Sequence, residues 1–179
     1  MSDDISPKLF MPNEFEKFVL PNHAPLTAHI SRAHAERLDP SSMERNGRST
    51  RIISINEPFS PDGDATLSGN WDSKLVMRFC DVTDEKIESS ITDGMAEDIA
   101  EFISDNYRSN IFVHCRAGVS RSAAIARLLS ECGWEAAPGS FFQHANILVY
   151  NKVKKFLIPK LEKLGSFQKF IKEKLEQRK

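Results

Sequence analysis

One stretch, residues 110–133, constrains the fold of this chain more than any other: NIFVHCRAGVSRSAAIARLLSECG. Its first residues, NIFV at 110–113, form a short apolar run typical of a buried strand. RSAAIARLLSEC at 121–132 repeats apolar residues at helical spacing, and Gly133 is placed to end that helix. Small residues lie between the two. In α/β proteins, a strand, a tight loop and a helix in this order present a ligand at the carboxyl end of the strand.

The rest of the chain alternates between the two kinds of element. TRIISI at 50–55 and KLVMRFC at 74–80 are rich in β-branched and large apolar residues, which predicts strands. The segment 93–107 places apolar residues on one helical face, and 56–73 has the composition of a loop. We therefore expect an α/β fold of three layers, with a central, mostly parallel sheet flanked by helices. The N-terminal third gives no clear pattern.

The chain has the size of one domain. Its 179 residues are 40% hydrophobic, enough for a single core, and we expect one domain over 1–179, with 1–20 a flexible or edge segment. Residues 165–179 are predicted to be a basic C-terminal helix. The net charge of −1 is uninformative by itself; nucleic acid is an unlikely partner, and the oligomeric state is not indicated. Since no apolar run reaches membrane-spanning length, we expect a cytoplasmic protein with no membrane contact.

The loop before the predicted helix has the features of an anion site. A helix start offers unpaired backbone N–H groups and the positive end of the helix dipole. Small residues allow the backbone to curl so that successive N–H groups converge on an oxyanion. A guanidinium adds a planar fork that matches two phosphate oxygens. We therefore predict phosphate binding by the residues of the loop: Arg116, Ala117, Gly118, Val119, Ser120 and Arg121.

Cys115 begins this loop and is the candidate nucleophile. The helix dipole, the N–H groups and Arg121 all favour its thiolate, which would attack phosphorus. Ser122 can donate to the sulfur and help it leave a phosphocysteine, while His114 is expected to orient the loop from behind. A buried structural cysteine beside a capping serine would explain the thiol and one serine. It would not explain the glycine and arginine at their spacing.

The stretch HCRAGVSRS resembles the signature loop of the cysteine-dependent protein tyrosine phosphatase superfamily, and its middle residues are similar to those of dual-specificity phosphatases. The likeness extends more weakly over about residues 50–160, where RIISINEP, VMRFCDV and FFQHANILVYNKV resemble small single-domain members of bacterial and phage type. The resemblance implies a phosphatase fold of the dual-specificity kind. Nothing resembles the phosphotyrosine-recognition loop of the large tyrosine-specific enzymes, so a shallower pocket is implied.

The resemblance also implies a general acid, an aspartate on a loop roughly thirty residues before the cysteine. Two candidates compete in FCDVTDE. The spacing slightly favours Asp84. Asp81 directly follows the predicted strand, whose end faces the same edge of the sheet as the loop, and it is our first choice.

The activity that the resemblance implies is hydrolysis of phosphate monoesters on a protein or peptide, with phosphotyrosine first and phosphoserine or phosphothreonine as further substrates. No cofactor or metal is expected. An RNA 5′-triphosphatase or a phosphoinositide phosphatase of the same superfamily, or a catalytically silent phosphate-binding module, are the alternatives. A sulfurtransferase fits less well, because Arg121 and an upstream acid suit phosphate better. Cys80 adjoins the predicted acid and could protect the nucleophile after oxidation, although a structural thiol is favoured.

Overall fold

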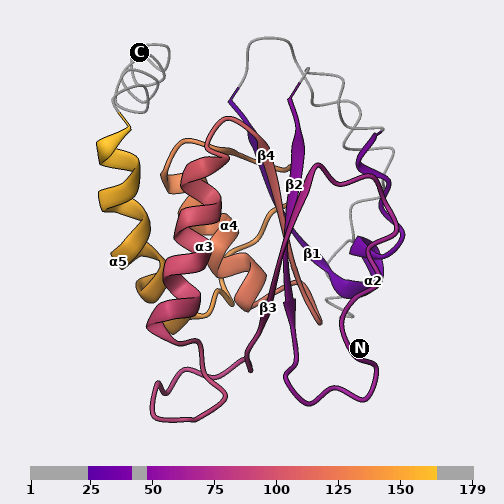
Figure 1. Ribbon diagram of the computed structural model, residues 1–179, viewed down its shortest axis with the longest axis vertical. Helices are drawn as coiled ribbons and strands as arrows, with labels where there is room; N and C mark the ends of the chain where they lie inside the picture. The colour runs from indigo at the N-terminus through magenta and orange to yellow at the C-terminus, as the bar shows by residue number, and fades with distance from the viewer. Residues whose placement is uncertain (1–23, 42–47, 165–179) are drawn as a thin grey trace, which may run out of the picture.

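A five-stranded parallel sheet forms the centre of the molecule (Figure 1). The computed structural model describes residues 24–41 and 48–164. The strands lie in the order β3-β2-β4-β1-β5, and all four neighbouring pairs are parallel. Their bounds are Leu26–Ser31 (β1), Thr50–Asn56 (β2), Ser73–Arg78 (β3), Asn110–Cys115 (β4) and Glu135–Ala136 (β5).

Helices lie on both faces of this sheet, which confirms the predicted α/β architecture. α3 (Asp93–Asp105), α4 (Arg121–Glu131) and α5 (Ile147–Lys163) cover one face, and the short α2 (Arg32–Ala35) lies on the other (Figure 1). The larger core cluster is built mostly of β2, β4 and the three long helices. A smaller cluster on the α2 face includes Trp71 and Phe112, whose rings meet edge to face. In the described residues, this second face of the sheet is therefore covered by the single turn of α2 and by the loop before β3.

The ends of the long helices are fixed by local chemistry. Thr92 caps α3 by accepting the N–H of Met95, at 3.1 Å. At the end of α4, Gly133 has a φ of +106°. Its N–H donates to the carbonyl of Ser130 and the next N–H, of Trp134, donates to that of Leu129. These two bonds form a Schellman ending, as the glycine after this helix predicted.

Several boundaries differ from the expected ones. β3 ends at Arg78 rather than residue 80, because the N–H of Cys80 turns to the carbonyl of Ser89. β4 runs two residues further than expected, through Cys115. Helices α3 and α4 end slightly earlier than predicted, and the loop expected at 56–73 occupies the gap between β2 and β3. The proposed segments 1–20 and 165–179 lie outside the described residues.

The parallel arrangement brings four strand ends to one edge of the sheet. β1, β2, β3 and β4 end at Ser31, Asn56, Arg78 and Cys115, so the loops that follow them share that edge. Such an edge is where α/β sheets hold their ligands. No helix within 24–41 and 48–164 is long and apolar enough to cross a membrane.

Candidate active site

The thiol of Cys115 lies at the start of the loop that joins β4 to α4, residues 115–121. The side chain is 2% exposed. Its Sγ accepts the backbone N–H of Gly118 at 3.3 Å and lies 3.2 Å from the hydroxyl of Ser122, in the first turn of α4. The sulfur therefore sits among hydrogen-bond donors at the positive end of an eleven-residue helix.

Gly118 lets this loop close against β1. Its φ is +75°, and a Cβ built there would lie 2.4 Å from the backbone nitrogen of Ser31 and 2.5 Å from the carbonyl carbon of Ile30. Both contacts are with backbone, which cannot move aside. The N–H of Arg32 also donates to the carbonyl of Arg116, at 3.3 Å. The position therefore requires glycine for its backbone conformation and for the space.

His29 of β1 holds the same glycine from the other side. Its Nδ1 lies 2.7 Å from the carbonyl oxygen of Gly118, and its Nε2 accepts the N–H of Phe141 at 3.1 Å. Since one ring nitrogen faces a carbonyl and the other an N–H, the neutral tautomer with hydrogen on Nδ1 satisfies both. Burial lowers the pKa of His29 and the bond to Gly118 partly opposes this. The ring thereby ties the 115–121 loop to the segment before α5.

Arg121 is buried beneath the loop, with 2% of its surface exposed. One terminal nitrogen donates to the carbonyl of Phe79 at 2.7 Å, and the other forms an ion pair with Glu57. Within the described residues, Nε has no hydrogen-bond partner. A guanidinium carries five N–H donors. The two bonds fix its plane and leave donors, including the buried Nε–H, for a ligand.

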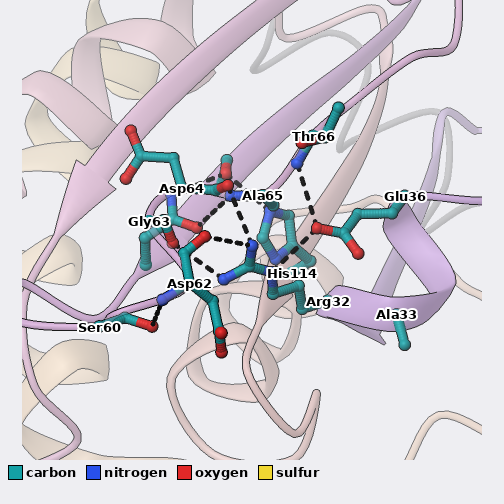
Figure 2. Close-up of polar contacts among 12 residues, drawn as sticks. Arg32, Ala33, Glu36, Ser60, Asp62, Gly63, Asp64, Ala65, Thr66 and His114 are labelled. Carbon is teal, nitrogen blue, oxygen red and sulfur yellow. Dashed lines mark hydrogen bonds and ion pairs between the residues drawn. The ribbon is translucent and has the colours of Figure 1, made fainter.

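The loop that carries Glu57 is itself fastened to α2 (Figure 2). Arg32 donates to the carbonyls of residues 62, 63 and 64 at 2.9–3.2 Å and pairs with Glu36 at 2.9 Å. Glu36 also accepts the N–H of Thr66, at 3.1 Å. The hydrogen bond from Arg32 lowers the pKa of Glu36, so the carboxylate stays charged. These bonds fix residues 62–66 of the loop, whose first residue, Glu57, holds Arg121.

The structure separates the two candidate acids. Asp81 accepts the hydroxyl of Ser120, in the 115–121 loop, at 2.8 Å and the side-chain amide of Asn146 at 2.7 Å. The carboxylate of Asp84 instead accepts the N–H of Lys86, within its own exposed turn. Of the two, Asp81 is therefore the one bonded to the loop of Cys115.

His114 lies behind the loop, on β4, with no exposed surface. Its Nε2 is 2.7 Å from the hydroxyl of Ser54 on β2. Burial lowers the pKa of His114 to about 4, so the ring is neutral at pH 7. The hydroxyl of Ser54 also accepts a hydrogen bond from the side-chain amide of Asn56. The side-chain oxygen of Asn56 in turn accepts the backbone N–H of Ala65. A neutral imidazole so bonded supports the strand end from which Cys115 projects.

The remaining predicted residues fall around this centre. Within the loop, Arg116 and Ala117 are exposed, while Val119 and Ser120 are half-buried. Cys80 is partly buried beside Asp81 and has a free thiol. Burial raises the pKa of Cys132 to about 12, which makes it unreactive. Across the described ranges, no three His, Cys, Asp or Glu residues cluster as metal ligands would.

Three residues of the site were not foreseen: His29, Glu57 and Asn146. Glu57 carried a usable signal, because an acid two residues after a predicted strand belongs to the same edge as Asp81. Asn146 precedes an apolar run, as an N-cap would, yet nothing in that pattern indicates what its amide contacts. His29 lies in the part of the chain where the sequence predicted no element.

Comparisons with known proteins leave the family open. No protein-family model matches the chain, and no curated protein matches it. Among solved structures, it is similar to the human tyrosine phosphatase-like serine/threonine/tyrosine-interacting protein, with 17% identity and a TM-score of 0.42. That match covers 72% of this chain and 88% of the other. Similarity at this level does not assign an activity, so the function has to come from the residues of the site.

Proposed function

We propose that this chain is a cysteine-dependent phosphatase that hydrolyses phosphate monoesters through a phosphocysteine intermediate. The observation that carries the proposal is the buried Cys115 thiol, bonded by the N–H of Gly118 and the hydroxyl of Ser122 at the start of α4, with Arg121 beneath the same loop. A structural cysteine has no need of a buried guanidinium with an unpartnered Nε–H. A tetrahedral oxyanion would satisfy that donor and the N–H groups of the loop.

In the first step, the Cys115 thiolate attacks phosphorus in line with the leaving oxygen. The S–P bond forms as the P–O bond breaks, and Asp81 gives its proton to the leaving oxygen. The backbone N–H groups of the loop and Arg121 stabilise the charge on the three equatorial oxygens. Glu57 and the carbonyl of Phe79 hold the guanidinium in plane, so it need not reorganise during the reaction.

In the second step, water attacks the phosphocysteine. The Asp81 carboxylate accepts a proton from the water as the O–P bond forms, and the S–P bond breaks to release phosphate and the thiolate. Ser122, 3.2 Å from the sulfur, donates its hydroxyl to the departing thiolate. His114 stays neutral and positions the strand end. The substrate class we propose is a phosphorylated protein or peptide, with phosphotyrosine before phosphoserine and phosphothreonine.

The test is hydrolysis of p-nitrophenyl phosphate across about pH 5 to 8 in the presence of a chelator. We expect turnover by the wild type with a bell-shaped pH profile, since one group must be ionised and the other protonated. Cys115→Ser should abolish turnover while leaving the fold intact by circular dichroism. Asp81→Asn should remove the alkaline limb of the profile, and Asp84→Asn serves as the matched control that keeps it. A well-folded wild type that hydrolyses neither this ester nor a phosphotyrosine peptide would refute the proposal in favour of a silent phosphate-binding module.

A further inference from the structure

Asn146 joins three parts of the site although it makes no hydrogen bond to the thiol or to the Arg121 side chain. It is buried, directly precedes α5, and its backbone N–H donates to the carbonyl of Ser120 at 3.2 Å. Its side-chain Nδ2 donates to Oδ1 of Asp81 at 2.7 Å and to the carbonyl of Val82 at 3.0 Å. One residue therefore connects the 115–121 loop, the loop that carries the candidate acid, and a long helix.

The helix fixes which way this amide faces. Oδ1 of Asn146 accepts the N–H groups of Leu148 and Val149, at 3.0 and 3.1 Å, as the N-cap of α5. Turning the amide over would place its NH₂ against two N–H donors and its oxygen against the carboxylate of Asp81. Both exchanges are repulsive. The helix start thus directs the amide donors toward Asp81.

The bonds to Asp81 determine which of its oxygens can carry a proton. Oδ1 accepts both the Ser120 hydroxyl and the Asn146 amide. An oxygen that accepts two such bonds has no lone pair left for a proton of its own. Oδ2 has no such partner in the described part of the chain, so the proton of the neutral carboxyl belongs there.

We propose that Asn146 is a positioning residue, which fixes the carboxyl of Asp81 so that Oδ2 presents the proton to the leaving oxygen. The inference rests on the proposed function and deepens it. Asn146 acts only through Asp81, so its contribution should depend on how much protonation the leaving group needs. A purely structural role would slow all substrates alike.

Two substitutions separate the cap from the positioning role. Asn146→Ser keeps an N-cap of similar strength, but its hydroxyl is too short to reach Asp81. Asn146→Asp is nearly isosteric, also caps well, and has no N–H to donate. Thr92→Ala is the matched control, since it removes the cap of α3 and touches neither Asp81 nor the 115–121 loop.

The assay compares kcat on two substrates for the full chain. p-Nitrophenolate is the more stable anion and needs less help from the acid, whereas the phenolate of a phosphotyrosine peptide has a conjugate acid of pKa ~10 and depends more strongly on the proton. For both Asn146 variants we expect kcat on the peptide to fall on the order of 10- to 100-fold, and kcat on p-nitrophenyl phosphate less than about 3-fold. Thr92→Ala should show no such selectivity. In an Asp81→Ala background, Asn146→Ser should cause no further loss.

The possible results separate the positioning role of Asn146 from the proposed phosphatase activity. An active wild type whose Asn146 variants lose rate equally on both substrates, or lose none, overturns the positioning role alone. An additional loss in the Asp81→Ala background does the same, because it shows that Asn146 acts by another route. A wild type without turnover overturns the proposed function and this inference with it.

Discussion

Acid should destabilise this protein partly through one residue, His114. Its pKa is about 4 in the folded chain because it is buried, against an ordinary value of 6.5. Between these values the unfolded chain binds the proton and the folded chain does not. Stability is therefore fully present above pH 6.5 and is lost as the pH falls toward 4. At 1.36 kcal/mol per pKa unit the whole effect is about 3 kcal/mol, of which about 2 kcal/mol is lost between pH 7 and 4.5.

The assay is urea unfolding of the wild type and His114→Gln at a series of pH values. Gln does not titrate, and its amide can keep the bond to the Ser54 hydroxyl. His29, His34 and the carboxylates titrate in both proteins, so their effects cancel in the difference. We expect the free energy of unfolding of the wild type to fall by about 2 kcal/mol more than that of the variant between pH 7 and 4.5. Parallel pH dependences in the two proteins would refute a neutral, buried imidazole at this position.

Gly118→Ala should abolish activity and destabilise the fold by about 2–5 kcal/mol, because the strain of a positive φ and the overlap of the new Cβ with backbone atoms both raise the energy of the folded state. Gly63→Ala is the control, with a φ of +62° and nothing within 4 Å of the new Cβ. It should cost about 1 kcal/mol of stability in thermal melts and keep activity. Glu57→Gln should lower kcat/KM about 10-fold and reduce Tm, because the substitution leaves the buried Arg121 charge without its carboxylate. Inorganic phosphate should restore part of the lost Tm by binding the guanidinium. Unchanged kinetics would contradict the pairing. Iodoacetamide near pH 7 should alkylate Cys115 and spare Cys132, whose pKa is about 12, as peptide mass spectrometry would show.

The elements that the sequence predicted correctly share a strong local pattern. β2 and β4 are runs of large apolar side chains, and α3 and α4 have clear helical spacing. β1 has neither property. Its buried residues include Thr27 and Ala28, and its neighbour α2 is only four residues long. A strand whose buried positions hold mostly small or polar residues is specified by its neighbours in the sheet, which no local pattern reveals.

The contacts of the candidate site likewise fall into local ones, which the sequence could predict, and long-range ones, which it could not. The contacts of Cys115 with Gly118 and Ser122 lie within one loop and helix start, so the spacing of the residues alone could predict them. Glu57 reaches Arg121 across 64 residues, and Asn146 reaches Asp81 across 65. Such pairs depend on the strand order β3-β2-β4 and on where α5 begins, and both are products of the tertiary fold.

The place of β1 between β4 and β5 also has a consequence for biosynthesis. Its backbone at Leu26 is bound by Asn110, 84 residues later, and His29 by Gly118 and Phe141, 89 and 112 residues later. Most of the chain must therefore be synthesised before β1 can pair with β4, and contacts of such long sequence separation form slowly. Until β1 pairs with β4, Gly118 has no ordered backbone to close against. The 115–121 loop would therefore take its final conformation around Cys115 only when the sheet is assembled.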